Sequence, residues 1–78
     1  MNKIRYKIEL VGLTDCKNFV NRIEKSGKKA KLTDGNGYCV SAKSLLGALA
    51  ALEWDELYVE SEDSLYNEVK EWVISDES

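Results

Sequence analysis

Apolar and charged residues alternate at the start of the chain, and this period of two predicts a half-buried β-strand over residues 3–11. The spacing then becomes helical. Thr14 or Asp15 is suited to cap a helix that runs to about Ser26 and is terminated by Gly27. The apolar stripe of this helix, at positions i, i+3, i+4 and i+7, consists of Cys16, Phe19, Val20 and Ile23.

Two shorter strands are predicted over residues 30–33 and 38–41. The segment Asp34-Gly35-Asn36-Gly37 between them is the strongest turn signal in the sequence, because Asp-Gly and Asn-Gly both favour hairpin turns with positive φ. A fourth strand is predicted over residues 57–60, and residues 61–64 provide caps and negative charge for a last helix. The apolar stripe of that helix consists of Leu65, Val69, Trp72 and Val73. Residues 75–78 are predicted to form a frayed acidic tail.

The predicted order of elements is therefore β-α-β-β-α-β-α. Strands with alternating patterns favour an antiparallel sheet with one wet face and with helices on the other face. The sequence thus predicts an α+β fold with a four-stranded antiparallel sheet and three helices on one side. No internal repeat, low-complexity run or linker interrupts the chain, so residues 1–78 are interpreted as one domain.

The second predicted helix, LLGALAAL over residues 45–52, is apolar on every side. Such a helix is either buried all round or presents one face to a partner. Ser44 is its predicted N-cap, and Gly47 suggests close packing because glycine weakens a helix. The predicted inward stripe is Ala48, Ala51 and Leu52. The leucines left to the rim or the outside are Leu45, Leu46 and Leu49. They form either a docking face or ordinary core under neighbouring loops, and the spacing leaves both interpretations open.

Composition limits the chemistry. A chain of 78 residues buries a thin core and has little room for a deep catalytic cleft. The absence of histidine excludes every mechanism that needs a histidine base, ligand or phosphocarrier, and the net charge of −3 weighs against nucleic acid. Cys16 and Cys39 match no CxxC or zinc spacing, and no run approaches the roughly 18 apolar residues of a membrane span. We therefore expect a cytoplasmic protein with free thiols, no metal, no cofactor and no membrane contact.

The order of elements, with the segment Lys43-Ser44-Leu45-Leu46-Gly47-Ala48-Leu49 at the start of the second helix, resembles HPr, the phosphocarrier of the bacterial sugar phosphotransferase system. The resemblance extends over nearly the whole chain, through Leu57-Tyr58-Val59-Glu60 and the closing helix, with few individual identities. It implies an open-faced β-sandwich. The expected partner-binding residues are Lys43, Ser44, Leu45, Leu46 and Leu49. The resemblance implies that the three leucines match the positions where HPr proteins dock their partners.

The sequence departs from HPr at the carrier site. In HPr the first helix opens with a motif like G-I-H-A-R-P-A, whose histidine carries phosphate and whose arginine helps to hold it. The corresponding stretch here is Gly12-Leu13-Thr14-Asp15-Cys16-Lys17-Asn18, in which Gly12 matches and the histidine position falls near Thr14. Because the chain has no histidine, a phosphohistidine relay is chemically impossible. The resemblance therefore implies a degenerate, HPr-like protein without the carrier function.

The resemblance also implies a regulatory site at Ser44. In Gram-positive relatives, an ATP-dependent kinase phosphorylates a serine at this position, and the product binds a transcriptional regulator. A histidine-lacking paralogue keeps only that role. A phosphate on Ser44 would lie at a helix N-terminus, where free N–H groups and the helix dipole favour it. The alternative is that Ser44 is only a cap, since serine is common there.

Other residues carry weaker signals. Cys16 lies near a helix start, where thiolates are stabilised, but its place in the apolar stripe favours a buried structural thiol. Trp54 is interpreted as a lid over the sheet edge or as a docking aromatic. The flanking acidic residues, Glu53, Asp55 and Glu56, lack the spacing of a calcium loop and indicate a solvated loop. A basic cluster around the turn at Gly27 consists of Lys25, Lys28, Lys29 and Lys31.

The sequence thus predicts a small protein-binding or regulatory module rather than an enzyme, because no catalytic constellation can be assembled from its residues. It is expected to be a monomer or a weak dimer that binds an unidentified protein. Two alternatives stay open. One is a small nucleic-acid-binding domain that uses the lysine cluster and Tyr6 or Tyr58 on the open sheet face. The other is a homo-oligomerisation domain that pairs through its leucines.

Overall fold

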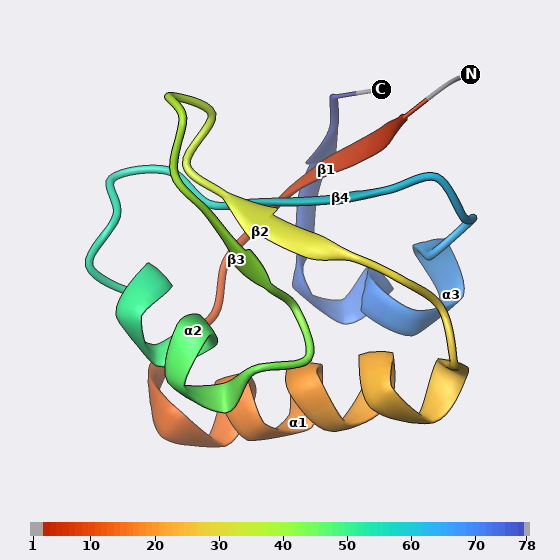
Figure 1. Cartoon of the computed structure of the whole chain (residues 1–78), viewed down its shortest axis with the longest axis horizontal. Coiled ribbons are helices and arrows are strands. Elements are labelled where there is room, and N and C mark those ends of the chain that lie inside the picture. Colours follow the sequence, from red (N-terminus) through yellow and green to blue (C-terminus); the bar gives the residue numbers. More distant parts are fainter. Residues whose placement is uncertain (1–2, 78) are drawn as a thin grey trace.

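The computed structural model describes residues 3–77 as an antiparallel sheet with helices on one of its faces (Figure 1). In chain order the elements are β1 (Ile4–Ile8), α1 (Gly12–Ser26), β2 (Lys31–Thr33), β3 (Cys39–Ser41), α2 (Leu45–Ala51), β4 (Tyr58–Ser61), α3 (Tyr66–Val69), the 3-10 helix η1 (Lys70–Trp72) and β5 (Val73–Asp76). The five strands lie in the order β3-β2-β4-β1-β5. The α+β class is confirmed. The predicted four-stranded sheet is wrong, because β5 adds a strand beside β1.

β1 has the predicted alternation. Tyr6 and Ile8 are buried on the side of the helices, and the Tyr6 ring lies 5.9 Å from the ring of Tyr66 in α3. Arg5 and Lys7, which alternate with them, lie on the open face of the sheet. The placement of Tyr6 on the open face, which the nucleic-acid alternative assumed, is therefore wrong. The strand ends at Ile8 rather than at residue 11.

α1 begins earlier than predicted. Its N-cap is Val11, so Thr14 and Asp15 lie inside the first turn and neither is the cap. The Asp15 carboxylate instead reaches back and accepts a hydrogen bond from the Val11 N–H at 2.8 Å. Gly27 ends the helix with a φ of 71°, as predicted. The buried residues of the helix are Cys16, Phe19 and Ile23.

The hairpin of β2 and β3 forms where the glycine-rich turn predicted it. Asp34 directs the turn, because its carboxylate accepts hydrogen bonds from the N–H groups of Asn36 and Tyr38. Gly35 and Gly37 have φ values of 80° and 112°, which side chains disfavour. The turn is therefore specified by short-range interactions.

β4 lies in the middle of the sheet, between β2 and β1. Val59 is buried towards the helices, and Tyr58 and Glu60 alternate with it on the open face. The register places Glu60 opposite Lys31 on one side and opposite Arg5 on the other. Three charged side chains from neighbouring strands therefore meet in a row on the open face.

The last part of the chain differs most from the prediction. The stripe residues Leu65, Val69 and Trp72 are buried as predicted, and the Trp72 ring meets the Phe19 ring edge-on at 5.5 Å. However, α3 ends at Val69, η1 ends at Trp72, and Val73 opens β5 instead of continuing a helix.

β5 pairs with the edge of β1. Tyr6 lies opposite Asp76 and Lys7 opposite Ser75, and the Glu77 N–H donates to the Arg5 carbonyl at 2.8 Å. Satisfying the backbone groups of β1 outweighs adding helical turns at residues 73–76. The frayed tail predicted over residues 75–78 is therefore wrong for Ser75 and Asp76, while residue 78 lies outside the described residues.

Candidate functional site

α2 begins where the sequence predicted. Ser44 has an extended backbone, and its hydroxyl accepts a hydrogen bond from the Gly47 N–H at 3.0 Å. The Ser44 N–H donates to the Ser41 carbonyl at 3.2 Å, so the cap is held by β3 as well as by the helix. The Ser44 hydroxyl is committed to the cap. Because the residue is only half-buried, part of its side chain still reaches the surface.

The leucines of α2 do not share one environment. Ala48 and Ala51 are buried against the core, as predicted, and Leu52 is half-buried. Leu45 and Leu49 are also half-buried and pack against the core. The sequence placed these two leucines at the rim or on the outside, and the structure exposes only part of each side chain. Leu46 is 81% exposed, the largest fraction among the exposed large hydrophobic residues of the described chain. The apolar surface of α2 is therefore centred on Leu46.

A close approach between α2 and β3 fixes the orientation of the helix. A Cβ atom at Gly47 would lie 3.1 Å from Val40 Cβ and 3.2 Å from Val40 Cγ2. These distances are tighter than nine in ten Cβ contacts, so a side chain larger than glycine would require the neighbouring atoms to shift by a few tenths of an ångström. This contact determines which face of α2 is turned outward.

Lys43 precedes the cap and is half-buried. Its backbone N–H donates to the Ser41 hydroxyl at 3.1 Å. Within residues 3–77, the ion pairs do not include the Lys43 ammonium group. A positive charge without a carboxylate partner thus lies at the N-terminal end of the leucine surface.

The start of α1 carries no reactive group. Gly12 has a φ of 72°, Thr14 is exposed, and the Asp15 carboxylate is bound to the Val11 N–H. Cys16 is fully buried, and burial, with a smaller contribution from Asp15, raises the pKa of its thiol. The thiol is therefore protonated at neutral pH, which agrees with a structural role.

A second feature, on the open sheet face, was not recognised from the sequence. Arg5 donates through Nε to Glu60 Oε2 at 2.6 Å, and its second nitrogen contacts the same oxygen. The Lys3 and Lys31 ammonium groups lie 4.0 and 3.9 Å from the other carboxylate oxygen. The Glu60 side chain is only 8% exposed, although it lies on the open face, because these cations cover it. The outward position of Glu60 follows from strand alternation, but its neighbours are known only once the strands are paired.

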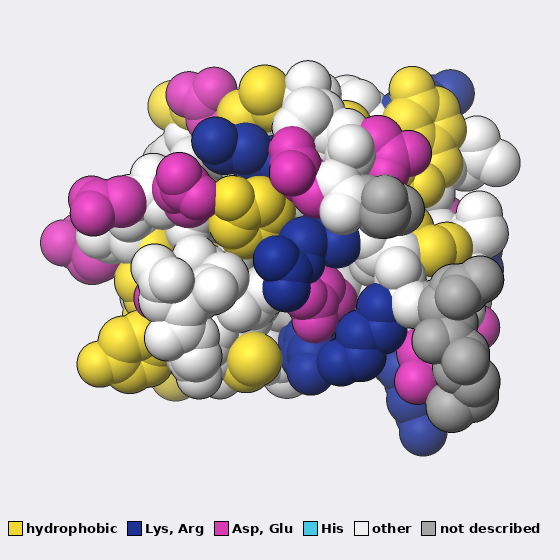
Figure 2. Space-filling view, turned by 90° about the horizontal axis from the view of Figure 1, so that it is seen from above, with side chains coloured by type: hydrophobic (Ala, Val, Ile, Leu, Met, Phe, Trp, Pro, Cys, Tyr) yellow, Lys and Arg dark blue, Asp and Glu magenta, His cyan; other side chains and the backbone are white. Residues whose placement is uncertain are grey.

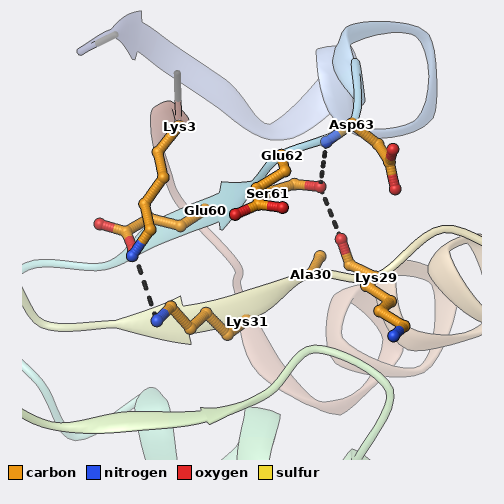
Figure 3. A pocket seen from close by; sticks show the side chains of 8 residues that line it. All are labelled: Lys3, Lys29, Ala30, Lys31, Glu60, Ser61, Glu62 and Asp63. Atoms are coloured by element: carbon orange, nitrogen blue, oxygen red, sulfur yellow. Dashed lines mark hydrogen bonds and ion pairs between the residues drawn. The ribbon is translucent and has the colours of Figure 1, made fainter. Parts of the chain in front are cut away.

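A hollow of about 540 Å³ opens beside this cluster (Figure 3). In Figure 3, Lys3 and Lys31 both point toward Glu60, and Lys29 points away from it. The Ser61 hydroxyl donates to the Lys29 carbonyl at 2.5 Å and accepts from the Asp63 N–H, which closes one end of the hollow. The lining has as many carboxylates as lysines, so the hollow does not by itself select an anion.

The lysine cluster predicted around Gly27 is dispersed. Lys28 donates to the Ser64 carbonyl at 2.6 Å and pairs with Glu68, while Lys31 pairs with Glu60 on the open face. These contacts divide the lysines between two sides of the molecule. They do not form the continuous basic surface that backbone phosphates would require.

Trp54 covers the end of the sheet. It is half-buried, packs against the core and stacks on Tyr38 with the rings 6.4 Å apart and inclined by 25°. This arrangement favours the lid interpretation over the docking one. Within the described residues, no group of three or more His, Cys, Asp or Glu side chains is arranged to hold a metal ion.

Comparison with known proteins adds no further assignment. No family model, curated protein or solved structure matches this chain. Among residues 3–77, no helix combines the length and the apolar character needed to cross a bilayer.

Proposed function

We propose that this chain is an HPr-like module without the phosphocarrier function, and that it binds a protein partner through the apolar surface of α2 centred on Leu46. The observation that carries the proposal is the 81% exposure of Leu46 on a helix whose neighbouring leucines pack against the core. A leucine in that position exposes apolar surface to water, and a partner that covers it removes this cost.

The placement of Leu46 has a structural cause. The Val40–Gly47 contact and the Ser44 cap both hold α2 in one orientation, so Leu46 is presented by a rigid element. A pre-oriented anchor loses little conformational entropy on binding. Lys43 beside it favours a partner surface that has an apolar pocket next to a carboxylate.

The relationship to HPr rests on the order of elements and on the segment around Ser44. The sequence of strands and helices up to α3 follows the β-α-β-β-α-β-α order of that family, and β5 is an addition. The chain contains no histidine, so the proposed module has no phosphohistidine relay, and we propose that it acts by binding.

Serine phosphorylation is the switch that we propose for this surface. A phosphate on Ser44 would add negative charge beside Leu46 and Lys43, and would replace the hydroxyl that now accepts from Gly47 N–H. The test is the intact mass after incubation with an HPr serine kinase and ATP, with Ser44→Ala as the control. One added phosphate in the parent chain and none in the control is expected. An unchanged mass would leave Ser44 as a cap only.

Docking is tested with two matched substitutions. Leu46→Glu places a charge at the centre of the proposed surface, and Ile74→Glu places the same charge at an exposed apolar residue on β5, which is 56% exposed. We expect proteins retained by the parent chain and by Ile74→Glu to be lost by Leu46→Glu, with unchanged circular dichroism in all three. Equal retention by both variants would contradict docking through α2.

A further inference from the structure

The open sheet face and the end of the sheet carry two clusters of opposite charge, and neither is used in the proposed function. The basic cluster consists of Lys3, Arg5 and Lys31 around Glu60, and Glu62 and Asp63 line the hollow beside it. The two lysines lie at 3.9–4.0 Å from the shared carboxylate oxygen, beyond hydrogen-bond distance. Their N–H donors therefore remain available to another acceptor.

The acidic cluster lies at the end of the sheet, where the β2–β3 turn and the α2–β4 connection meet (Figure 1). A hollow of about 390 Å³ between the β2–β3 turn and the α2–β4 connection is lined by four carboxylates and by the Tyr38–Trp54 stack. The four carboxylates are those of Asp34, Glu53, Asp55 and Glu56. Among residues 3–77, no ion pair joins any of them to a lysine or an arginine.

The two clusters are separated on the surface. Figure 2, which looks down on the sheet, shows several Asp and Glu side chains at the left, where Figure 1 places the β2–β3 turn and the α2–β4 connection, and others near the upper middle and at the right. Lys and Arg side chains gather around a carboxylate nearer the centre. The acidic hollow and the basic cluster therefore lie at different places on the surface.

We infer that the open sheet face binds a second copy of this chain, face to face and related by a two-fold axis. In this arrangement the basic cluster of each copy lies over the acidic cluster of the other. An isologous interface requires a surface that is complementary to itself. A two-fold axis between the two clusters creates two identical contacts, each between the basic cluster of one copy and the acidic cluster of the other. A purely acidic partner would satisfy the basic cluster and leave the four carboxylates unpaired.

A nucleic acid fits this face less well. Single strands bind sheets by stacking bases on exposed aromatic rings. The Tyr58 ring is covered by the Arg5 guanidinium at 5.2 Å, and Gly35 lies against its edge, with a Cβ position 3.1 Å from Tyr58 Cε2. Tyr6 is buried on the helix side. Tyr38 is 69% exposed, but its ring stacks on Trp54 in the acidic hollow, where the four carboxylates repel phosphates.

The dimer is expected to be weak and sensitive to salt. A sheet of short strands buries less than the roughly 800 Å² per partner of a standard interface. Its stability comes from exposed charges, whose attraction is screened beyond about 10 Å at 0.1 M salt. Sedimentation velocity at about 1 mM protein, where a complex with a millimolar Kd is half formed, should show dimers at low salt and monomers at high salt.

Charge reversal gives the decisive test. Lys3→Glu with Lys31→Glu makes both clusters acidic, and Glu53→Lys with Asp55→Lys changes the acidic cluster from four negative charges to two of each sign, so that it no longer attracts the basic cluster. Each double variant alone should be monomeric, and an equimolar mixture of the two should form a heterodimer. Glu53 and Asp55 are exposed and unpaired, so the second variant should fold even if the reversal beside Glu60 disturbs the first.

Other results would contradict the inference. A parent chain that stays monomeric at low salt overturns the inference, and so does a dimer that persists in the Glu53→Lys, Asp55→Lys variant. Leu46→Glu serves as the control for the other surface. If that substitution alone abolishes the dimer, the pairing uses α2 and the open face is not the interface.

Discussion

Gly47→Ala tests whether α2 is fixed against β3. Alanine is favoured over glycine in a helix interior by about 0.8–1.0 kcal/mol, so propensity alone predicts stabilisation. The structure predicts the opposite sign. The new methyl group would lie 3.1 and 3.2 Å from two carbon atoms of Val40 and 3.3 Å from Ser44 Cβ, closer than the roughly 3.5–4.0 Å at which carbon atoms attract.

The crowding cannot be relieved by a rotamer change alone. Rotation about χ1 moves Val40 Cγ2, but Val40 Cβ is attached directly to the strand backbone, so α2 and β3 must separate. Adding a methyl group to a packed site typically costs about 1–3 kcal/mol. After subtracting the gain in propensity, we expect Gly47→Ala to lower the free energy of unfolding by about 1 kcal/mol.

Urea and thermal unfolding followed by circular dichroism measure this change, which corresponds to about 4–8 °C in Tm for a domain of this size. Ala50→Gly, at an exposed position of the same helix, isolates propensity and should cost about 1 kcal/mol. Val40→Ala removes Cγ2 but keeps Cβ, so the double variant should recover about 0.5–1 kcal/mol of coupling. If Gly47→Ala raises stability by as much as Ala50→Gly lowers it, α2 is free to move and the fixed presentation of Leu46 is refuted.

Four further predictions concern single residues. Ser44→Ala removes the hydroxyl that accepts from Gly47 N–H and should cost about 1 kcal/mol in urea unfolding, whereas Ser44→Asp, which keeps a capping oxygen, should cost less. A thiol reagent should modify exposed Cys39 in the native protein and buried Cys16 only after unfolding, and two fast thiols would contradict the burial. Burial raises the pKa of Tyr6 above its usual value of about 10, so Tyr6 ionises at lower pH in the unfolded state than in the folded state. The free energy of unfolding should therefore fall as the pH rises through 10 towards the folded pKa, and Tyr6→Phe should flatten that decline. Glu60→Gln leaves three cations without their carboxylate and should cost about 1–2 kcal/mol at low salt and less at high salt, while a salt-independent loss would point to packing instead.

The features that could be predicted from the sequence are those set by interactions between residues close together in the chain. The turn at Asp34 is specified by one carboxylate and two glycines, and the start of α2 by the Ser44 hydroxyl, all within a few residues. The alternation in β1 correctly separated Tyr6 and Ile8 from the charged residues between them. Such features need no information about distant parts of the chain.

The errors arose where distant segments compete. The spacing of Leu65, Val69 and Trp72 fits a helix, and nothing local shows that Val73 will instead pair with the edge of β1. The exposure of Leu46, in contrast to Leu45 and Leu49, depends on the rotation of α2 about its axis, which the contact with Val40 sets.

Of the two candidate surfaces, one could be recognised from the sequence and the other could not. The leucines of α2 could be named from composition, because an apolar helix in a small chain is conspicuous. The cluster around Glu60 could not, since Lys3, Arg5 and Lys31 come from two distant segments and meet only through the registers of β1 and β2 with β4. Charge clusters that depend on strand order require the assembled sheet.

The pairing of β1 with β5 also determines how the molecule would respond to a pulling force. The strands are antiparallel, and the Glu77 N–H meets the Arg5 carbonyl, so the beginning and the end of the described chain lie side by side. Tension applied through both ends acts along the hydrogen bonds that join these strands and breaks them one after another, rather than shearing them together. β5 would peel away first, while the hairpin and α2, which bear no direct load, would keep their structure.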